Sequence, residues 1–477
     1  MASTDITTSR PDRGWRQLLG PDHLGPMVVL AGGVALYAIN IYLTTSLLPS
    51  AVDEIGGVRF YAWATTIFLV ASVISAVLVS RLLAAAGPRG AYLVAIGLFA
   101  AGTVVCAAAP DMFVLLAGRG LQGFGGGLLS GLSYALIRST LPQHLWARAS
   151  ALVSGMWGVG TFVGPALGGV FAQFGAWRLA FVVLAVLAAG IAAIVPRYIA
   201  GDRIEGRKVA VPAVSMLLLS AAALLVSVAG IATSAALTAV GVVAGVALLL
   251  VFVAHERRSA NRVLPAVTFA PRNTLKWTYA TFALLAVAST AETFVPLFGQ
   301  RLGGLEPLAA GFLGAALAVG WTLGEISSAG ASHRSTVRAL VVTGPAMVAV
   351  GFLVAAATQR GGATAGVIGV WVAALVLGGA GIGVAWPHLA TFAMGAADDE
   401  VEGGKAAAAI NTVQLVANAV GSAMAGVLVN LGGSMEDSAK LLFGCFAVFA
   451  AAGVLTAWRS TRPRGSDRDE PDRVSGP

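Results

Sequence analysis

Four ionisable side chains lie inside long apolar stretches of the sequence. Arg119 is set in LLAGRGLQGFGGGLLSG, Glu292 in STAETFVP and Glu325 in GWTLGEISS, and His388 follows Trp386-Pro387. A carboxylate or imidazole that alternates between water and a less polar site can take up a proton on one side and release it on the other. A charge at membrane depth is costly unless it is paired or hydrated, so each of these residues is a functional candidate.

The position of each group along its segment suggests its task. We predict that Glu292, toward the outer half of a span, and Glu325, toward the inner half, carry protons. Arg119 is predicted to take part in this coupling, with Glu292 as its partner. The alternatives are that Glu292 is paired near the outer mouth and that Glu325 is a gate partner for Arg338. His388 is more typical of a structural or vestibule histidine.

Neutral polar side chains at helical spacing predict a lined cavity. They share one face around residue 40 and another around residue 415. Such a cavity suits a largely apolar ligand with a few hydrogen-bonding groups. The alternative is polar contact between helices, worth about 1 kcal/mol per bond. The predicted lining residues are Tyr37, Asn40, Thr44, Gln122, Trp157, Asn411, Gln414 and Asn418, with Trp321 and Trp386 as further aromatic neighbours.

The composition requires membrane helices to position these residues. Of 477 residues, 57% are hydrophobic and 11% are charged, whereas a soluble domain carries about 25% charged residues. The mean hydropathy is +0.84. The net charge of +8 is spread in small groups, which argues against a nucleic-acid partner. Scattered histidines and two cysteines in apolar runs predict no metal, no cofactor and no enzyme site.

Fourteen stretches are long and apolar enough to cross a bilayer, which needs roughly 20 residues per helix. Fourteen rather than twelve depends on a turn at Thr233-Ser234. The predicted spans are 27–49, 60–84, 90–109, 112–140, 147–173, 177–198, 211–233, 235–254, 274–299, 308–331, 338–358, 364–396, 404–431 and 438–458.

The distribution of basic residues orients these spans. With the N-terminus inside, 24 lysines and arginines fall on cytoplasmic segments and five fall outside, namely Arg59, Arg178, Arg301, Arg360 and Lys440. Basic residues accumulate on the cytoplasmic side of short loops. Both termini are therefore predicted to be cytoplasmic, in the cell membrane, as tails over 1–26 and 459–477 without a cleaved signal peptide.

An internal repeat divides the spans into two halves. Gly120, Gly123 and Gly125 match residues 258 positions later, and the glycines from 164 to 169 match residues 257 positions later. We therefore expect six-helix bundles over 27–198 and 274–458, joined by a linker over 199–273 that holds two extra spans. Parallel repeats with a site near the midplane between them are typical of secondary transporters.

Two motifs resemble those of a known family. Arg119, Gln122 and Gly123 match the R-x-x-Q-G core of the fourth helix in the major facilitator superfamily. The run GVGTFVGPALGG is similar to the fifth-helix motif of its drug:proton antiporters, and Trp177-Arg178 with Phe181 is similar to the entry of the sixth helix. The motif residues carried over from the fifth helix are Gly160, Gly164, Pro165, Gly168 and Gly169. Glycines every four residues also make a flat ridge for close helix contact.

The chain departs from that family in two places. In the loop between helices two and three, Ala84 and Ala85 stand where relatives carry aspartate and arginine, so the usual cytoplasmic latch is missing. In helix one, Asn40 stands where relatives carry aspartate.

The resemblance to the fourteen-spanner drug:proton antiporter group implies proton-coupled efflux of an amphipathic small molecule by alternating access. The protein is predicted to act as a monomer, with protons, the small-molecule substrate and the lipid bilayer as its partners. The alternatives are an ion-coupled importer or a uniporter of a small metabolite, a membrane-embedded enzyme, and a transporter-like scaffold without transport.

Overall fold

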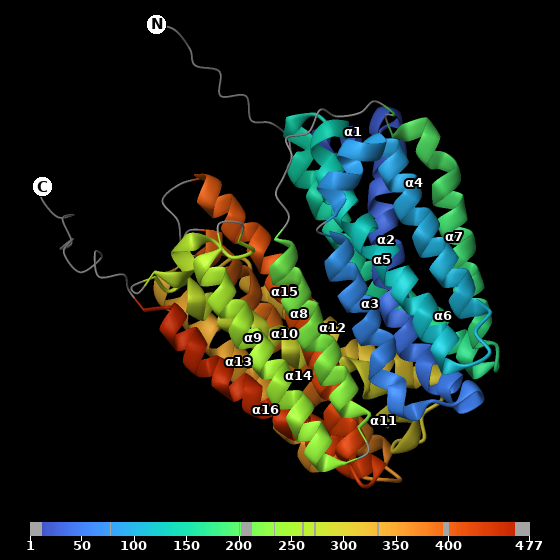
Figure 1. Ribbon diagram of the computed structural model, residues 1–477, viewed down its shortest axis with the longest axis vertical. Helices are drawn as coiled ribbons and strands as arrows, with labels where there is room; N and C mark the ends of the chain where they lie inside the picture. Colours follow the sequence, from blue (N-terminus) through green and yellow to red (C-terminus); the bar gives the residue numbers. More distant parts are fainter. Residues whose placement is uncertain are drawn as a thin grey trace, which may run out of the picture.

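The structure, a computed structural model, describes residues 12–76, 78–199, 201, 212–232, 234–259, 262–270, 273–331, 333–394 and 400–462, and this part of the chain is helical (Figure 1). The first half contains α1 Asp12–Leu18, α2 Pro21–Ile55, η1 Val58–Phe60, α3 Tyr61–Ala76, α4 Val79–Ala107, α5 Met112–Thr140, η2 Gln143–Leu145, α6 Trp146–Gln173 and α7 Trp177–Tyr198. The extra pair is α8 Ala213–Gly230 and α9 Ala235–Arg258. The second half contains η3 Ala266–Phe269, α10 Leu275–Ser289, η4 Thr290–Thr293, α11 Val295–Arg301, α12 Pro307–Ser328, α13 Arg334–Thr358, α14 Ala365–Met394, α15 Glu400–Leu431 and α16 Met435–Ser460.

Fourteen spans are confirmed, because the described chain holds fourteen helical stretches that are long and apolar enough to cross a membrane. The extra pair is two separate helices, as predicted. Ser234 is the N-cap of the second helix, and its hydroxyl accepts a hydrogen bond from the Leu237 N–H at 3.3 Å. Thr233 itself, residues 202–211 of the predicted linker, and residues 1–11 and 463–477 of the predicted tails lie outside the described residues.

The predicted end of the second span is wrong. The span ends at Ala76 rather than Ala84, and residues 79–86 form a separate helical segment that runs into the third span. Gly87 separates that segment from the span with a φ of +68°, a conformation that side-chain-bearing residues rarely adopt. Pro88 then restarts the helix with a fixed φ. Ala84 and Ala85 therefore lie on a helix and not in a loop.

The internal repeat is confirmed, and its register in the fourth helix of each half is corrected. A Cβ on Gly123 or Gly127 would meet the backbone of α3, and one on Gly379 or Gly383 would meet the backbone of the corresponding α12. These pairs are 256 residues apart and not 258. The alternating glycines of α5 allow both alignments, and only the identity of the packing partner distinguishes them.

The fifth helices match at the predicted offset of 257. A Cβ on Gly169 of α6 would lie 2.6 Å from Cα of Leu308 at the start of α12. A Cβ on Gly426 of α15 would lie 2.5 Å from the Cβ of Ala62 at the start of α3. Each fifth helix thus packs on the second helix of the other half. We call these two contacts the α6–α12 seam and the α3–α15 seam.

Both seams lie at the end of the bundle remote from α1, where the two bundles converge in Figure 1. We call this the closed end. The Thr66 hydroxyl donates to Oγ of Ser422 at 3.1 Å across one seam, and the rings of Tyr61 and Phe294 stack with centroids 4.9 Å apart. Arg301 forms an ion pair with Asp53 across the same end. The halves are therefore joined where the spans 61–76 and 307–328 begin.

Candidate functional site

Glu292 lies where the ninth span is broken. The α-helix α10 ends at Ser289, the 3-10 turn η4 carries Glu292, and Pro296 near the start of α11 lacks the N–H that would continue a regular helix. Irregular backbone at membrane depth is tolerated where it is enclosed by protein or lines a cavity. The break thus presents a carboxylate where an unbroken helix would present a packed side chain.

The Glu292 side chain lines a small cavity between the two halves. The cavity and its opening to solvent hold about 210 Å³ of empty space. The part of the chain that the structure describes provides no hydrogen bond or ion pair to the Glu292 carboxylate. The lining residues are Tyr42, Thr45 and Ser46 of α2, Pro165 of α6, Glu292, Pro296, and Gly311, Gly314 and Ala315 of α12.

Sequence reasoning missed the α2 side of this cavity. Tyr42, Thr45 and Ser46 belong to the polar run YLTTS, but the predicted cavity face was the adjoining one with Tyr37, Asn40 and Thr44. The polar run was a visible signal. The face of α2 that lines the cavity is determined by the contact of α2 with α12. The spacing of residues within α2 does not reveal this contact.

The fifth-helix glycines divide into two groups. A Cβ on Gly160, Gly164 or Gly168 would lie within 2.7 Å of α2, at Ala38, Tyr42 and Leu43 respectively, so this ridge packs inside the first half. The close approach expected from the four-residue spacing is confirmed. Gly169 instead faces Leu308 in the other half. Pro165 also reaches across, because its Cβ lies 3.4 Å from the Cβ position of Gly311.

We expect Gly169→Ala to weaken the closed end. The added Cβ would sit 2.6 Å from Cα of Leu308, which is backbone and cannot turn aside. Overpacking of this kind costs about 1–3 kcal/mol, so the ratio of closed to open molecules should fall by roughly 5- to 150-fold. Oxidative cross-linking between Thr66→Cys and Ser422→Cys, with Cys106 and Cys445 replaced by serine, measures closure at the other seam.

Gly158→Ala is the matched control for that experiment. It lies on the same helix, and nothing stands within 4 Å of its Cβ position. Equal cross-linking yields in the two alanine variants would show that Gly169 does not set the closed state.

Arg119 is enclosed within the first half. Its Nε donates to the Ala64 carbonyl at 3.0 Å, and its Nη1 donates to Oε1 of Gln122 at 2.6 Å. Gln122 in turn donates to Oγ1 of Thr103 at 2.9 Å. The guanidinium also lies 4.2 Å from the ring centre of Phe68. This network joins α3, α4 and α5.

Glu292 is not among the partners that the structure gives Arg119. The Arg119 side chain is 1% exposed, and Gln122 is fully buried beside it. In this conformation the network therefore fixes the first half internally, and the predicted pairing of Arg119 with Glu292 stays a prediction.

The predicted polar face of α2 is buried. Tyr37 packs against Phe68 and Trp157 with ring centres 5.3 and 5.7 Å away. Thr44 donates to Oδ1 of Asn40 at 3.4 Å, while Nδ2 of Asn40 is enclosed with no partner among the residues described. A buried amide nitrogen without a partner is a costly arrangement. It leaves one buried hydrogen-bond donor unpaired among the described residues in this conformation.

The other predicted cavity residues are less enclosed. Trp157 is 38% exposed, and Gln414 and Asn418 on α15 are partly exposed. Oδ1 of Asn418 is buried without a partner within the described chain. The side chain of Asn411 lies outside the described residues. Asn40 in one half thus offers an unpaired donor and Asn418 in the other an unpaired acceptor.

Glu325 lies on the face of α12 that carries Gly311 and Ala318, at helical spacing toward the other end of the span. Gly311 contacts Ser46 and Pro165 of the first half, so this face is directed between the bundles. The Glu325 side chain is exposed, and the described residues place no basic group, Arg338 included, in an ion pair with it. His388 is buried, and its Nε2 has no partner in the described chain.

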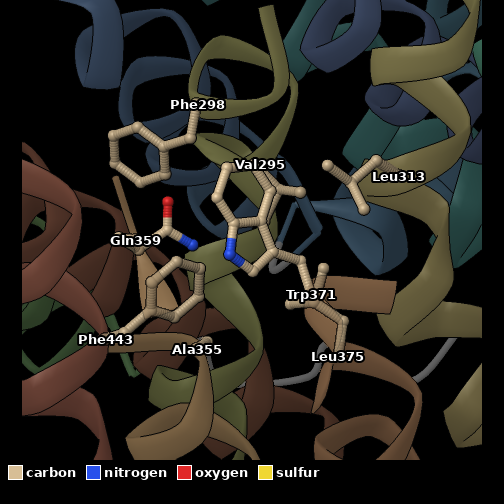
Figure 2. A pocket seen from close by; sticks show the side chains of 8 residues that line it. All are labelled: Val295, Phe298, Leu313, Ala355, Gln359, Trp371, Leu375 and Phe443. Atoms are coloured by element: carbon tan, nitrogen blue, oxygen red, sulfur yellow. The ribbon is translucent and has the colours of Figure 1, made fainter. Parts of the chain in front are cut away.

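A second small cavity lies wholly within the second half, behind α11 (Figure 2). It holds about 230 Å³ of empty space. Val295 and Phe298 of α11, Trp371 of α14 and Phe443 of α16 are among the residues that line it. Oε1 of Gln359 is buried here with no partner among the described residues.

Two six-helix bundles related by a parallel repeat, closed at one end with a cavity between them, define a secondary transporter. Residues 30–421 match the family model described as Major Facilitator Superfamily. The chain belongs to the major facilitator superfamily, and it is a membrane transporter and not an enzyme.

Similar proteins agree with this assignment. The chain is 49% identical over 463 residues, 95% of its length and 98% of the other, to a probable multidrug-efflux transporter of Mycobacterium tuberculosis (strain ATCC 25618 / H37Rv). It is 23% identical to the multidrug transporter protein MdtP of Bacillus subtilis (strain 168) over 66% of this chain and 59% of that protein. A solved POT family peptide transporter matches with a TM-score of 0.66 at 16% identity, covering 93% of this chain and 98% of that one. That structural likeness concerns the fold alone.

Proposed function

We propose that this protein exports amphipathic small molecules across the cell membrane in exchange for protons, by alternating access. The observation that carries the proposal is the position of Glu292. It sits at a helix break and lines a cavity to which both halves contribute. The probable multidrug-efflux transporter, 49% identical over nearly the whole chain, supports drugs as the substrate class.

The two carboxylates stand at different depths of the proposed pathway. With both termini in the cytoplasm, as the excess of basic residues predicts, the closed end faces outward. Glu292 is then near the outer gate. Glu325 lies near the cytoplasmic end of α12, on the face directed between the bundles. Each opening of the outer gate would expose Glu292 to external protons, and each closing would enclose it, which is the alternation that coupling needs.

The substrate is proposed to bind between the bundles, between α2 and α6 of one half and α15 of the other. Trp157 provides an exposed aromatic surface, and the unpaired amide groups of Asn40 and Asn418 provide one donor and one acceptor. Tyr37, Thr44 and Gln414 complete the proposed lining, while Gln122 is buried in the network of Arg119 in this conformation. A largely apolar site with a few polar groups suits an amphipathic compound.

Transport by everted membrane vesicles tests this function. Vesicles whose interior is more acidic than the surrounding buffer should accumulate a fluorescent amphipathic dye, and a protonophore should release the dye. Transport that persists after every ion gradient is dissipated would instead identify a uniporter. The absence of transport over a broad panel of compounds would contradict the proposal altogether.

A further inference from the structure

The extra helix α8 lies along the α3–α15 seam and contacts both halves. Ala223 belongs to a cluster with Phe68 of α3 and Ala419 of α15. Val226 packs with Ala423 and Val427 of α15. An inserted helix that only filled space in the lipid would not need to cover the line along which the two halves must separate.

The closed end of α8 is tied to the first half by side chains of η1 and α3. Nη2 of Arg59 donates to the carbonyls of Ile231 and Ala232, at 3.0 and 3.2 Å. One turn further along, Nε1 of Trp63 donates to the Ser227 carbonyl at 3.1 Å. The last carbonyls of a helix lack partners within it and carry its partial negative charge, so a guanidinium is the group suited to them.

The same end of α8 is tied to the second half. Nδ2 of Asn430 donates to the Gly230 carbonyl at 3.1 Å and to the Arg59 carbonyl at 2.9 Å. A Cβ on Gly230 would lie 3.2 Å from the backbone nitrogen of Val427, so the two helices are in close contact. Arg59, Asn430 and the end of α8 therefore form one hydrogen-bonded junction among three parts of the molecule.

The other end of the extra pair is fastened to the second half by a buried carboxylate. Glu256 of α9 is fully buried. It accepts from the Ser215 hydroxyl of α8 at 2.5 Å and from the backbone N–H groups of Val263 and Leu264 at 2.9 and 2.8 Å. These last two residues lead into α10. The pair α8 and α9 should therefore move with the second half when the two bundles rock.

We propose that Arg59 is a positioning residue for alternating access, and that it holds α8 as a brace across the α3–α15 seam. Opening of the closed end breaks the bonds from Arg59 and Trp63 to α8, and the bonds at Glu256 and Gly230 persist. The extra helices thereby supply a latch at the closed end, opposite the end of the spans at which Ala84 and Ala85 replace the usual cytoplasmic charge pair. This inference rests on alternating access and not on proton coupling.

Distance measurements between spin labels test the latch. The full chain carries labels at Phe174→Cys after α6 and Leu441→Cys on α16, both exposed near the closed end, with Cys106 and Cys445 replaced by serine. Measurements without substrate or proton gradient keep the outcome independent of the proposed function. We expect Arg59→Ala to lower the ratio of short to long distances about tenfold, because charged hydrogen bonds are lost. Trp63→Phe should shift it in the same direction by less.

Two comparisons separate a latch from a structural contact. Arg59→Lys keeps a cation beside the α8 carbonyls, so its ratio of short to long distances should lie between those of the parent and Arg59→Ala. Arg360→Ala removes an exposed arginine between α13 and α14, to which the described residues give no hydrogen bond, and should leave the ratio unchanged. If Arg59→Ala lowers the melting temperature but leaves the ratio within twofold of the parent, the junction is structural only and the proposal is overturned. An equal shift in Arg360→Ala would overturn it as well.

Discussion

Replacing Glu292 by glutamine is expected to abolish proton-driven accumulation while leaving downhill movement of substrate. The amide has nearly the same shape as the acid but cannot release a proton, so it occupies the cavity between α2, α6 and α12 in one protonation state only. A gradient of one pH unit supplies about 1.4 kcal/mol per proton, which sustains about tenfold accumulation. In the variant this ratio should fall to about one.

The measurement is substrate accumulation by reconstituted proteoliposomes over a range of imposed pH gradients. Glu306→Gln is the matched control, because Glu306 is an exposed carboxylate just before α12 near the same end of the molecule. Accumulation that still follows the gradient in Glu292→Gln would reject Glu292 as the coupling residue. The inner carboxylate, tested as Glu325→Gln, would then be the remaining acid of the proposed pathway.

The elements of this fold could be predicted from the sequence because lipid imposes strict local requirements. Each span must satisfy its backbone within one helix, so length and hydropathy alone located the fourteen helices. The exception was local too. The second span was predicted to reach Ala84 because Ser80 and Arg81 are the only polar residues between 77 and 84, but its helix ends at Ala76, and Gly87 with its positive φ separates residues 79–86 from the third span.

Contacts between helices were predictable only where small residues recur. Gly160, Gly164 and Gly168 allowed one close approach, and the structure makes it with α2. Sequence spacing did not reveal that the next residue, Gly169, faces the opposite half. The repeat register in α5 was two residues off for the same reason, since glycine patterns match at several offsets and only packing partners choose among them.

The candidate site was predicted one residue at a time. Glu292 and Pro165 were selected separately, by charge and by motif, and the structure brings both to one cavity. The ion pair of Asp53 with Arg301 and the junction at Arg59 were not foreseen. Each contact joins residues more than 170 positions apart. In the sequence, Asp53, Arg301 and Arg59 are distinguished only by being charged residues near the end of a span.

Replacing Arg119 by leucine is expected to destabilise the protein strongly. The change leaves Oε1 of Gln122 buried without its donor and removes the bond to the Ala64 carbonyl. Leaving a buried acceptor without its donor costs about 1–3 kcal/mol for each of these two groups, and the melting temperature should fall by roughly 5–10 °C. Thermal unfolding of the purified protein measures this loss.

The double variant Arg119→Leu with Gln122→Met separates stability from transport. Replacing both polar partners by apolar groups of similar shape is often nearly neutral, so we expect the melting temperature to recover most of its fall. Transport should not recover. Arg119 holds Ala64 of α3, two residues before Thr66, which donates to Ser422 across the α3–α15 seam.

Removing the bond to Ala64 therefore frees the part of α3 that closes this seam, even in a stable molecule. Wild-type accumulation by the double variant would show that Arg119 serves the fold of the first half alone. Loss of accumulation together with a normal melting temperature would show that the buried arginine positions α3 for closure. Arg119 would then act on the cavity that Glu292 lines without contacting Glu292, because it controls the seam beside that cavity.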